Sequence, residues 1–290
     1  MVSIFKKIFG YSWGPRLEYI LRNSLLTLTE IPDATLKAIP LLLTNSQFRD
    51  RVIAKLQDDT LKAYWRDEFN AMPPNLQQEA ISPILNKVGQ FVASPLVRNV
   101  IGRSKSSIDL EAVMNEGKIL LANLSQGKIG EDNSQILGAM LITKFQLAAM
   151  QRAQIPEAKR RDFYLYVDEF QNFATDSFVK ILSEARMYHL NLVLANQYVA
   201  QIPTEVQKAI LGNIGTLISF QVGAEDGHLL KREFAGVYSE NDLVNLANRQ
   251  IVVKLMIEGY AQRPFLAETL LLQMTPTGHK KKGIIPSQQV

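Results

Sequence analysis

The stretch FYLYVDEFQNF, Phe163 to Phe173, decides how the rest of the sequence is interpreted. Its first residues, Phe163–Val167, are apolar without a polar break, which is typical of a strand buried on both faces of a parallel sheet. Asp168 and Glu169 follow at the carboxyl end of this strand, the edge at which open α/β sheets bind ligands. The pattern predicts a Walker B strand, in which the aspartate holds Mg²⁺ through its water shell and the glutamate orients the attacking water. An apolar strand that ends in a solvated acidic turn is the alternative.

Composition sets limits on the class of protein. The chain has 290 residues, of which 47% are hydrophobic, enough for a substantial core. The absence of cysteine excludes disulfide frameworks and thiolate metal sites, and it fits a reducing cytoplasm. The three histidines, His189, His228 and His279, lie far apart without the spacing of metal ligands. A net charge of +4 permits an anionic partner but does not require one.

The region up to residue 105 is predicted to be helical and to contain no strand. Apolar residues recur at helical spacing from Arg16 to Leu28, from about Asp33 to Phe69 with a disturbance near Pro40, and from residue 77 to 100. The apolar stretch that starts the chain is far too short to span a membrane, and it lacks a signal-peptide cleavage site. We therefore expect an amino-terminal helical region, residues 1–105, without a transmembrane segment.

From residue 106 to 275 the pattern changes to alternating strands and helices. A short helix, Leu110 to Glu116, is followed by the apolar strand Lys118–Ser125 and by a long apolar helix from Glu131 to Arg152. Beyond the Phe163–Val167 strand, further strands are predicted at Asn191–Gln197, Thr216–Gly223, Ile251–Ile257 and Pro264–Leu270. This alternation predicts an α/β domain with a mostly parallel, doubly wound sheet. Residues 276–290 are polar and basic and are predicted to be a disordered tail.

Two further side chains are candidates for chemistry. Gln197 follows the strand after the acidic pair, the usual place of a polar sensor that touches the γ-phosphate or the attacking water; a glutamine that caps a loop is the alternative. Arg186 lies in the intervening helix, off the apolar face formed by Ile181, Leu182, Ala185 and Tyr188. Such an arginine is commonly solvated, but it is also free to reach a neighbouring subunit.

A phosphate-binding loop is missing from the sequence. A nucleotide motor needs the pattern GxxxxGK followed by Ser or Thr, because backbone N–H groups and a lysine must meet the phosphates. The nearest candidates, Gly127-Lys128 and Gly102–Ser107, each lack one of the required glycines. We therefore expect the isolated chain to bind ATP weakly, if at all, and not to hydrolyse it.

Several stretches, read together, resemble the carboxyl-terminal half of the HerA/FtsK superfamily of P-loop motors. They are WGPRLEYILRNSLLTL (13–28), NLSQGKIGEDN with LGAML (123–141), FYLYVDEFQNF (163–173), ILSEARMYHLNLVLANQY (181–198) and GNIGTLISFQVG (212–223). The sequence is most similar to TraD/TraG-type coupling proteins of type IV secretion and to HerA-like DNA-pumping ATPases. The likeness spans nearly the whole chain in family order. It implies a RecA-like P-loop NTPase core preceded by the helical segment that the family inserts between Walker A and Walker B.

The resemblance also implies roles and partners. Asp168 and Glu169 would be the Walker B pair, Gln197 the sensor, and Arg186 an arginine finger offered to the neighbouring subunit's nucleotide. ATP, Mg²⁺ and DNA would be bound by a cytoplasmic homo-hexamer that meets type IV secretion or relaxosome proteins, which could hold it at the inner membrane. Two departures stand out: the Walker A half is missing, and Gln221 stands where a basic residue is expected in relatives.

Two other interpretations remain open. Asp-Glu-Phe-Gln also resembles the second motif of a superfamily 1 helicase, which would need its own Walker A and a motif-rich second domain. Alternatively, the chain is a non-catalytic interaction subunit or a truncated gene product, in which the fold persists without a working hydrolytic site.

Overall fold

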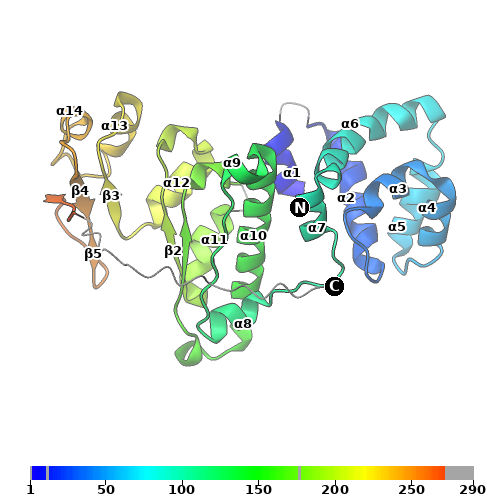
Figure 1. Ribbon diagram of the computed structural model, residues 1–290, viewed down its shortest axis with the longest axis horizontal. Coiled ribbons are helices and arrows are strands. Elements are labelled where there is room, and N and C mark those ends of the chain that lie inside the picture. Colours follow the sequence, from blue (N-terminus) through cyan, green and yellow to red (C-terminus); the bar gives the residue numbers. More distant parts are fainter. Residues whose placement is uncertain (1, 11–12, 176–177, 272–290) are drawn as a thin grey trace, which may run out of the picture. The chain divides into compact units, whose positions relative to one another are not determined.

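The computed structural model describes residues 2–10, 13–175 and 178–271, which form two compact units (Figure 1). The first unit extends to Asn213 and the second begins at Ile214. This division differs from the predicted boundary at residue 105, because the helical region and the first two strands belong to the same unit. The predicted tail, residues 276–290, lies outside the described residues.

The amino-terminal part of the first unit is helical, and in its described residues no strand occurs, as the sequence predicts. Its elements are α1 (Val2–Phe9), α2 (Pro15–Glu30), α3 (Ala38–Thr44), α4 (Ser46–Ile53), α5 (Asp59–Ala63), the π-helical turn η2 (Tyr64–Phe69), α6 (Pro74–Ala93) and α7 (Pro95–Ile101). Local signals explain the boundaries. Prolines stand in the first turns of α2, α6 and α7, where their missing N–H groups are not needed. The Asn45 side chain caps α4 by accepting a hydrogen bond from Phe48 N at 2.8 Å.

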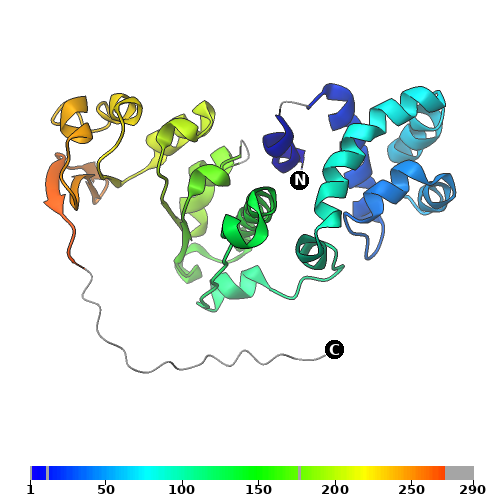
Figure 2. The same ribbon diagram turned by 45° about the horizontal axis from the view of Figure 1, so that its top comes forward.

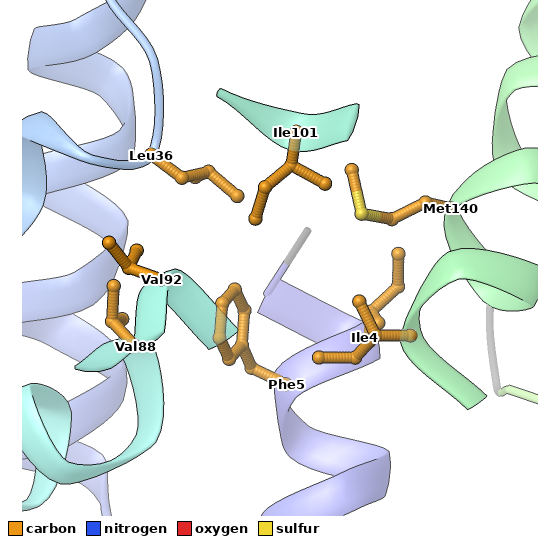
Figure 3. A pocket seen from close by; sticks show the side chains of 8 residues that line it. Ile4, Phe5, Leu36, Val88, Val92, Ile101 and Met140 are labelled. Carbon is orange, nitrogen blue, oxygen red and sulfur yellow. The ribbon is translucent and has the colours of Figure 1, made fainter. Parts of the chain in front are cut away.

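The helical part has its own core, centred on aromatic rings of η2. Trp65 and Phe69 are fully buried and meet edge to face, with ring centroids 4.9 Å apart. Trp65 Nε1 donates a hydrogen bond to Thr27 Oγ1 at 2.8 Å, so the indole N–H is satisfied. Figure 3 shows that Ile4 and Phe5 of α1 point into the apolar space beside α6. The remaining cavity of about 10 Å³ is close to the smallest that holds one water.

A long apolar helix, α10 (Glu131–Gln151), joins this core to a second one. Ile136 and Ala139 pack in the helical core, whereas Ile142 and Phe145 pack in the core of the α/β part. A helix that is apolar all round is buried on several sides, and α10 is shared by two cores. The short helices α8 (Leu110–Asn115) and α9 (Gln126–Ile129) precede it.

The α/β part contains two parallel strands, β1 (Phe163–Val167) and β2 (Leu190–Leu194). Phe163 pairs with Leu190, and Val167 pairs with Leu194. One face of this sheet packs in the second core with residues of α10, α11 (Phe178–Glu184) and α12 (Thr204–Asn213). Figure 2 shows α10 and α11 on the same side of β2. Short 3₁₀ turns connect these elements: η3 (Arg152–Gln154), η4 (Glu157–Lys159), η5 (Phe170–Asn172), η6 (Ala185–Tyr188) and η7 (Val199–Gln201).

Arg152, which is 1% exposed, ties the amino ends of β1 and β2 together. Its guanidinium donates hydrogen bonds to Asn115 Oδ1 at 3.0 Å, to Tyr188 O at 2.7 Å, and to the carbonyls of His189 and Arg161. Burial is the main cause of the lowered pKa of Arg152. The side chain therefore acts as a buried clamp on backbone carbonyls.

The predicted strand Lys118–Ser125 is wrong as a strand, because in the structure it pairs with no neighbour. Leu120 and Leu124 pack against the second core, whereas Ile119 and Leu121 are 88% and 90% exposed. A strand requires a partner for its backbone groups, and an open cleft of about 1260 Å³ lies between this segment and β1.

The strands of the second unit are antiparallel, so the prediction of a mostly parallel sheet is wrong for this unit. Its strands are β3 (Leu217–Ser219), β4 (Gln250–Lys254), β5 (Met256–Ile257), β6 (Tyr260–Ala261) and β7 (Phe265–Glu268), and its helices are α13 (Ala224–Leu230) and α14 (Glu240–Val244). The order β3-β4-β7 is antiparallel throughout. The connection from β4 to β7 is a hairpin that turns at Glu258 and Gly259, both with positive φ, and it is too short for the crossover helix of a parallel pair.

Candidate functional site

The acidic pair stands on a turn that the two parallel strands hold in place. β1 ends at Val167, and Glu169 takes a left-handed conformation with φ 51° and ψ 43°. Such backbone is uncommon for a residue with a Cβ, and it persists where the surroundings determine it, often at functional sites. Here Asp168 Oδ1 accepts a hydrogen bond from Glu169 N at 3.0 Å, and the buried Phe170 donates its N–H to Ala195 O at 2.8 Å. Both ends of the turn are therefore fixed.

The side chain of Glu169 is held by two amides. Gln197 Nε2 donates to Glu169 Oε1 at 2.5 Å, and Gln171 Nε2 donates to Glu169 Oε2 at 2.6 Å. The prediction that Asp168, Glu169 and Gln197 lie together at one edge of the sheet is confirmed for their positions. Gln171 was missed by the sequence reasoning, although its amide, two residues after the glutamate, was visible in the opening stretch.

This edge opens into the cleft beside β1. Asp168, Glu169 and Gln197 line one part of the cleft together with Asn172 of η5. Asp168 and Gln197 are exposed, and Glu169 is partly buried. Carboxylate and amide oxygens are suitable ligands for Mg²⁺, so the residue types fit a hydrated magnesium ion. Among the described residues no group of three or more His, Cys, Asp or Glu could hold a metal, so such an ion would also need oxygens from a bound phosphate.

Arg186 lies apart from this edge. It is exposed on η6, which precedes β2, whereas Gln197 follows β2. A strand of this length spans about 17 Å, so the arginine stands at the opposite end of the sheet from the acidic pair. Ile181 and Ala185 are buried in the second core and Leu182 and Tyr188 pack against it, as predicted, which leaves Arg186 turned to solvent.

Comparisons with known proteins identify the architecture. No family model matches the sequence, and no curated protein matches it. Among solved structures, the plasmid coupling protein TrwB in complex with the GTP analogue GDPNP is similar over 87% of this chain and 62% of that chain, with a TM-score of 0.59 and 12% identity. The unbound bacterial conjugative coupling protein TrwBdeltaN70 is similar over 88% and 62%, with a TM-score of 0.58 and 13% identity.

The chain has the fold of a conjugative coupling protein. The relationship suggested by the sequence is thereby confirmed at the level of the fold, and so is the α/β, RecA-like class. The chain spans 62% of the length of the TrwB chains that it matches. TrwB has also been crystallised with ADP and Mg²⁺.

Two further observations concern the helicase alternative and the helices. The superfamily 1 helicase interpretation needs a second motif-rich domain, but the described residues from Ile214 onward form a small antiparallel unit. Within the described part of the chain, no helix has both the length and the apolar character required to cross a membrane.

Proposed function

We propose that this chain supplies the catalytic residues of an ATP-driven motor that moves DNA in the manner of conjugative coupling proteins. The observation that carries the proposal is the Glu169–Gln197 hydrogen bond, formed beside Asp168 at the carboxyl edge of two parallel strands. The fold supports it, because TrwB, which shares that fold, has been crystallised with nucleotide analogues and with ADP and Mg²⁺.

Each side chain has a task that its surroundings favour. Asp168 is exposed and can accept hydrogen bonds from the water shell of Mg²⁺, an ion that would neutralise phosphate charge when bound. Glu169 can orient and polarise the attacking water, because its carboxylate is held in one position by two amides. Gln197 would act as the sensor of the γ-phosphate, a role supported by the hydrogen bond of its amide to Glu169 at the same edge of the sheet.

Arg186 has a separate proposed role as an arginine finger. It stands on the opposite end of the sheet from the acidic pair of its own chain, so it would serve the nucleotide of a neighbouring subunit in a hexameric ring. An arginine supplied in trans stabilises transition-state charge and can raise the rate by about 10³- to 10⁵-fold. DNA would be the translocated polymer, and type IV secretion or relaxosome proteins would be its partners.

The test of catalysis uses the chain fused to an upstream segment that carries a Walker A loop. Glu169→Gln should lower DNA-stimulated ATP hydrolysis by about 10²- to 10⁴-fold while ATP binding is retained. Glu157→Gln, an exposed glutamate on η4, is the matched control and should hydrolyse at the wild-type rate. Equal hydrolysis by wild type and Glu169→Gln would refute the catalytic assignment.

The finger is tested by mixing subunits of the same fusion. Arg186→Ala should bind ATP and assemble but stall, and a Glu169→Gln subunit that retains Arg186 should restore turnover in mixed rings. Wild-type hydrolysis by Arg186→Ala would show that Arg186 is an ordinary surface arginine.

A non-catalytic interaction subunit is the second candidate function, and the missing phosphate loop favours it. In that case the fusion with a Walker A segment would bind nucleotide without hydrolysing it. DNA or secretion partners would then bind the chain equally well after Glu169→Gln.

A further inference from the structure

Arg160 ties the loop before β1 to the turn that carries Arg186. Its guanidinium Nη1 donates a hydrogen bond to Met187 O at 2.6 Å. Its Nε lies 3.0 Å from Arg152 O and 2.9 Å from Ile155 O, so the proton on Nε is shared between these two carbonyls. The bonds are charge-assisted, and a planar guanidinium makes all of them at once in one orientation. Met187, directly after Arg186, is therefore fixed to a residue 27 positions earlier in the chain.

The next two residues of the turn are held as well. Tyr188 O accepts a hydrogen bond at 2.7 Å from the buried Arg152. His189 has a left-handed backbone conformation, with φ 54° and ψ 36°, and its ring Nδ1 lies 3.0 Å from Asp162 Oδ1. Such a conformation is uncommon for a residue with a Cβ, and it persists where the surroundings determine it. His189 N also donates to Arg186 O at 3.1 Å, which closes the turn on the arginine itself.

On the other side of Arg186 the backbone is fixed by packing. Ala185 is 5% exposed and lies in the second core together with Ile181, one helical turn earlier. The guanidinium of Arg186, by contrast, is exposed and makes no hydrogen bond or ion pair with the described part of the chain. Arg186 thus combines a backbone that is held on both sides with a side chain that is not engaged. Less conformational entropy is then lost when such a side chain binds, because only its own torsions have to be ordered.

The residues that hold the turn are attached to the sheet. Arg160 and Asp162 immediately precede β1, whose five residues all pair with β2. A contact with a surface loop alone would let the turn move with that loop. Here the turn keeps its place relative to the strand that ends at the acidic pair.

We propose that Arg160, supported by the contact of Asp162 with His189, is a positioning residue that presents Arg186 to the nucleotide of a neighbouring subunit. The inference rests on the proposed function, because it concerns the arginine finger of that motor. A finger acts within a narrow geometry, since a misplacement of about 1 Å can cost about 100-fold in rate. Fixing the backbone at Met187 confines the guanidinium to the positions that the Arg186 side chain alone can reach. Arg160 acts through Arg186 and touches no reacting atom.

The first experiment measures the turn in the full chain without nucleotide. Because the sequence contains no cysteine, Met187→Cys, at a 55% exposed position, provides a single site for a nitroxide label. Electron paramagnetic resonance then reports the mobility of the turn. Arg160→Gln should shorten the rotational correlation time of the label at least about twofold, because the carbonyl of residue 187 loses its donor. Lys159→Gln, at an exposed lysine of η4, is the matched control and should leave the spectrum unchanged.

The second experiment measures ATP hydrolysis in the fusion with a Walker A segment. Arg160→Gln should lower kcat by about 10- to 100-fold and leave KM for ATP within about twofold, because only a transition-state contact is displaced. Adding Arg160→Gln to Arg186→Ala should cost nothing further, since a positioning residue has no effect once the side chain that it positions is gone. A Glu169→Gln subunit that retains both arginines should restore turnover to Arg160→Gln in mixed rings, which a general loss of folding would not allow.

The outcomes separate this inference from the proposed function. Unchanged label mobility in Arg160→Gln, or a further loss when Arg160→Gln is added to Arg186→Ala, would overturn the positioning role. A defect in Arg186→Ala with wild-type hydrolysis by Arg160→Gln would leave the finger intact and refute only the positioning role. Wild-type hydrolysis by Arg186→Ala would refute the finger itself. If circular dichroism shows that Arg160→Gln has unfolded, Arg160→Lys replaces it, because a flexible ammonium does not reproduce the planar fork of the guanidinium.

Discussion

Arg152 shows what a single side chain does for the frame of the site. Its guanidinium is buried and bonds to carbonyls at the amino ends of both parallel strands. Arg152→Met keeps the aliphatic volume but leaves those carbonyls without a donor, so the free energy of unfolding should fall by about 3 kcal/mol. Urea denaturation followed by tryptophan fluorescence measures this. Arg51→Met, at an exposed arginine of α4, should change stability by less than about 0.5 kcal/mol; equal effects of the two substitutions would contradict the clamp.

At this scale the sequence predicts residues that follow buried strands. Asp168, Glu169 and Gln197 were found because apolar runs precede them and strand ends share an edge. Arg152 was placed only as the end of a helix, because nothing local reveals that distant carbonyls converge on it. The contact between Gln171 and Glu169 depends on the left-handed backbone conformation of Glu169. That conformation is not predictable from the sequence, because it is uncommon for a residue other than glycine.

Helix α10 fixes the acidic turn through one close approach. A Cβ at Gly138 would overlap the ring of Phe173, four residues beyond Glu169. Gly138→Ala would ordinarily stabilise a helix by about 1 kcal/mol. Here it should destabilise the first unit by about 1 to 2 kcal/mol, because the ring must move. Phe173→Leu should offset this loss in a double-mutant cycle of urea unfolding; additive effects would show that the two residues are not in contact.

In the second unit, a capping box begins α14. Ser239 donates its backbone N–H and its hydroxyl to Asp242, each at 2.7 Å, and these bonds hold the pKa of Asp242 below its usual value. A lowered pKa in the folded state means that the carboxylate stabilises the cap above the unfolded pKa, about 3.9, and that this contribution is lost as the pH falls through the folded pKa.

An NMR titration of the Asp242 carboxyl tests this cap. Ser239→Ala removes the hydroxyl donor and leaves the backbone N–H, so the pKa should rise part of the way toward 3.9. Asp242→Asn should remove this contribution to the acid sensitivity of the unit. An unchanged pKa in Ser239→Ala would argue against the hydroxyl as a donor.

Elements were predicted better than their pairing. Helices and apolar strands follow from periodicity, and β1, β2 and α10 lie close to their predicted positions. Pairing depends on partners far away in the sequence. Lys118–Ser125 has the pattern of a strand but pairs with no other strand. The hairpin between β4 and β7 makes these two strands antiparallel, whereas the alternation of strands and helices predicted a mostly parallel sheet.

For the whole molecule, the missing phosphate loop has a measurable consequence. The purified chain should not hydrolyse ATP above background, and Glu169→Gln should leave that result unchanged. Positioning and charge stabilisation supply nearly all of phosphoryl-transfer catalysis, and the acidic pair alone provides neither for the β- and γ-phosphates. A coupled-enzyme assay with and without DNA measures turnover. Robust turnover that Glu169→Gln abolishes would reveal a phosphate loop hidden in this sequence.

Sharing α10 between two cores gives the first unit a mechanical property. The helix is about 32 Å long; Gly138 lies among the residues that serve the helical core, and those that serve the other core begin at Leu141. Close-packed interiors transmit displacement instead of absorbing it. In the proposed motor, a push on Phe173 from the acidic turn would therefore reach the helical region as a tilt of a stiff rod, which would deliver force from the sheet to the amino-terminal helices.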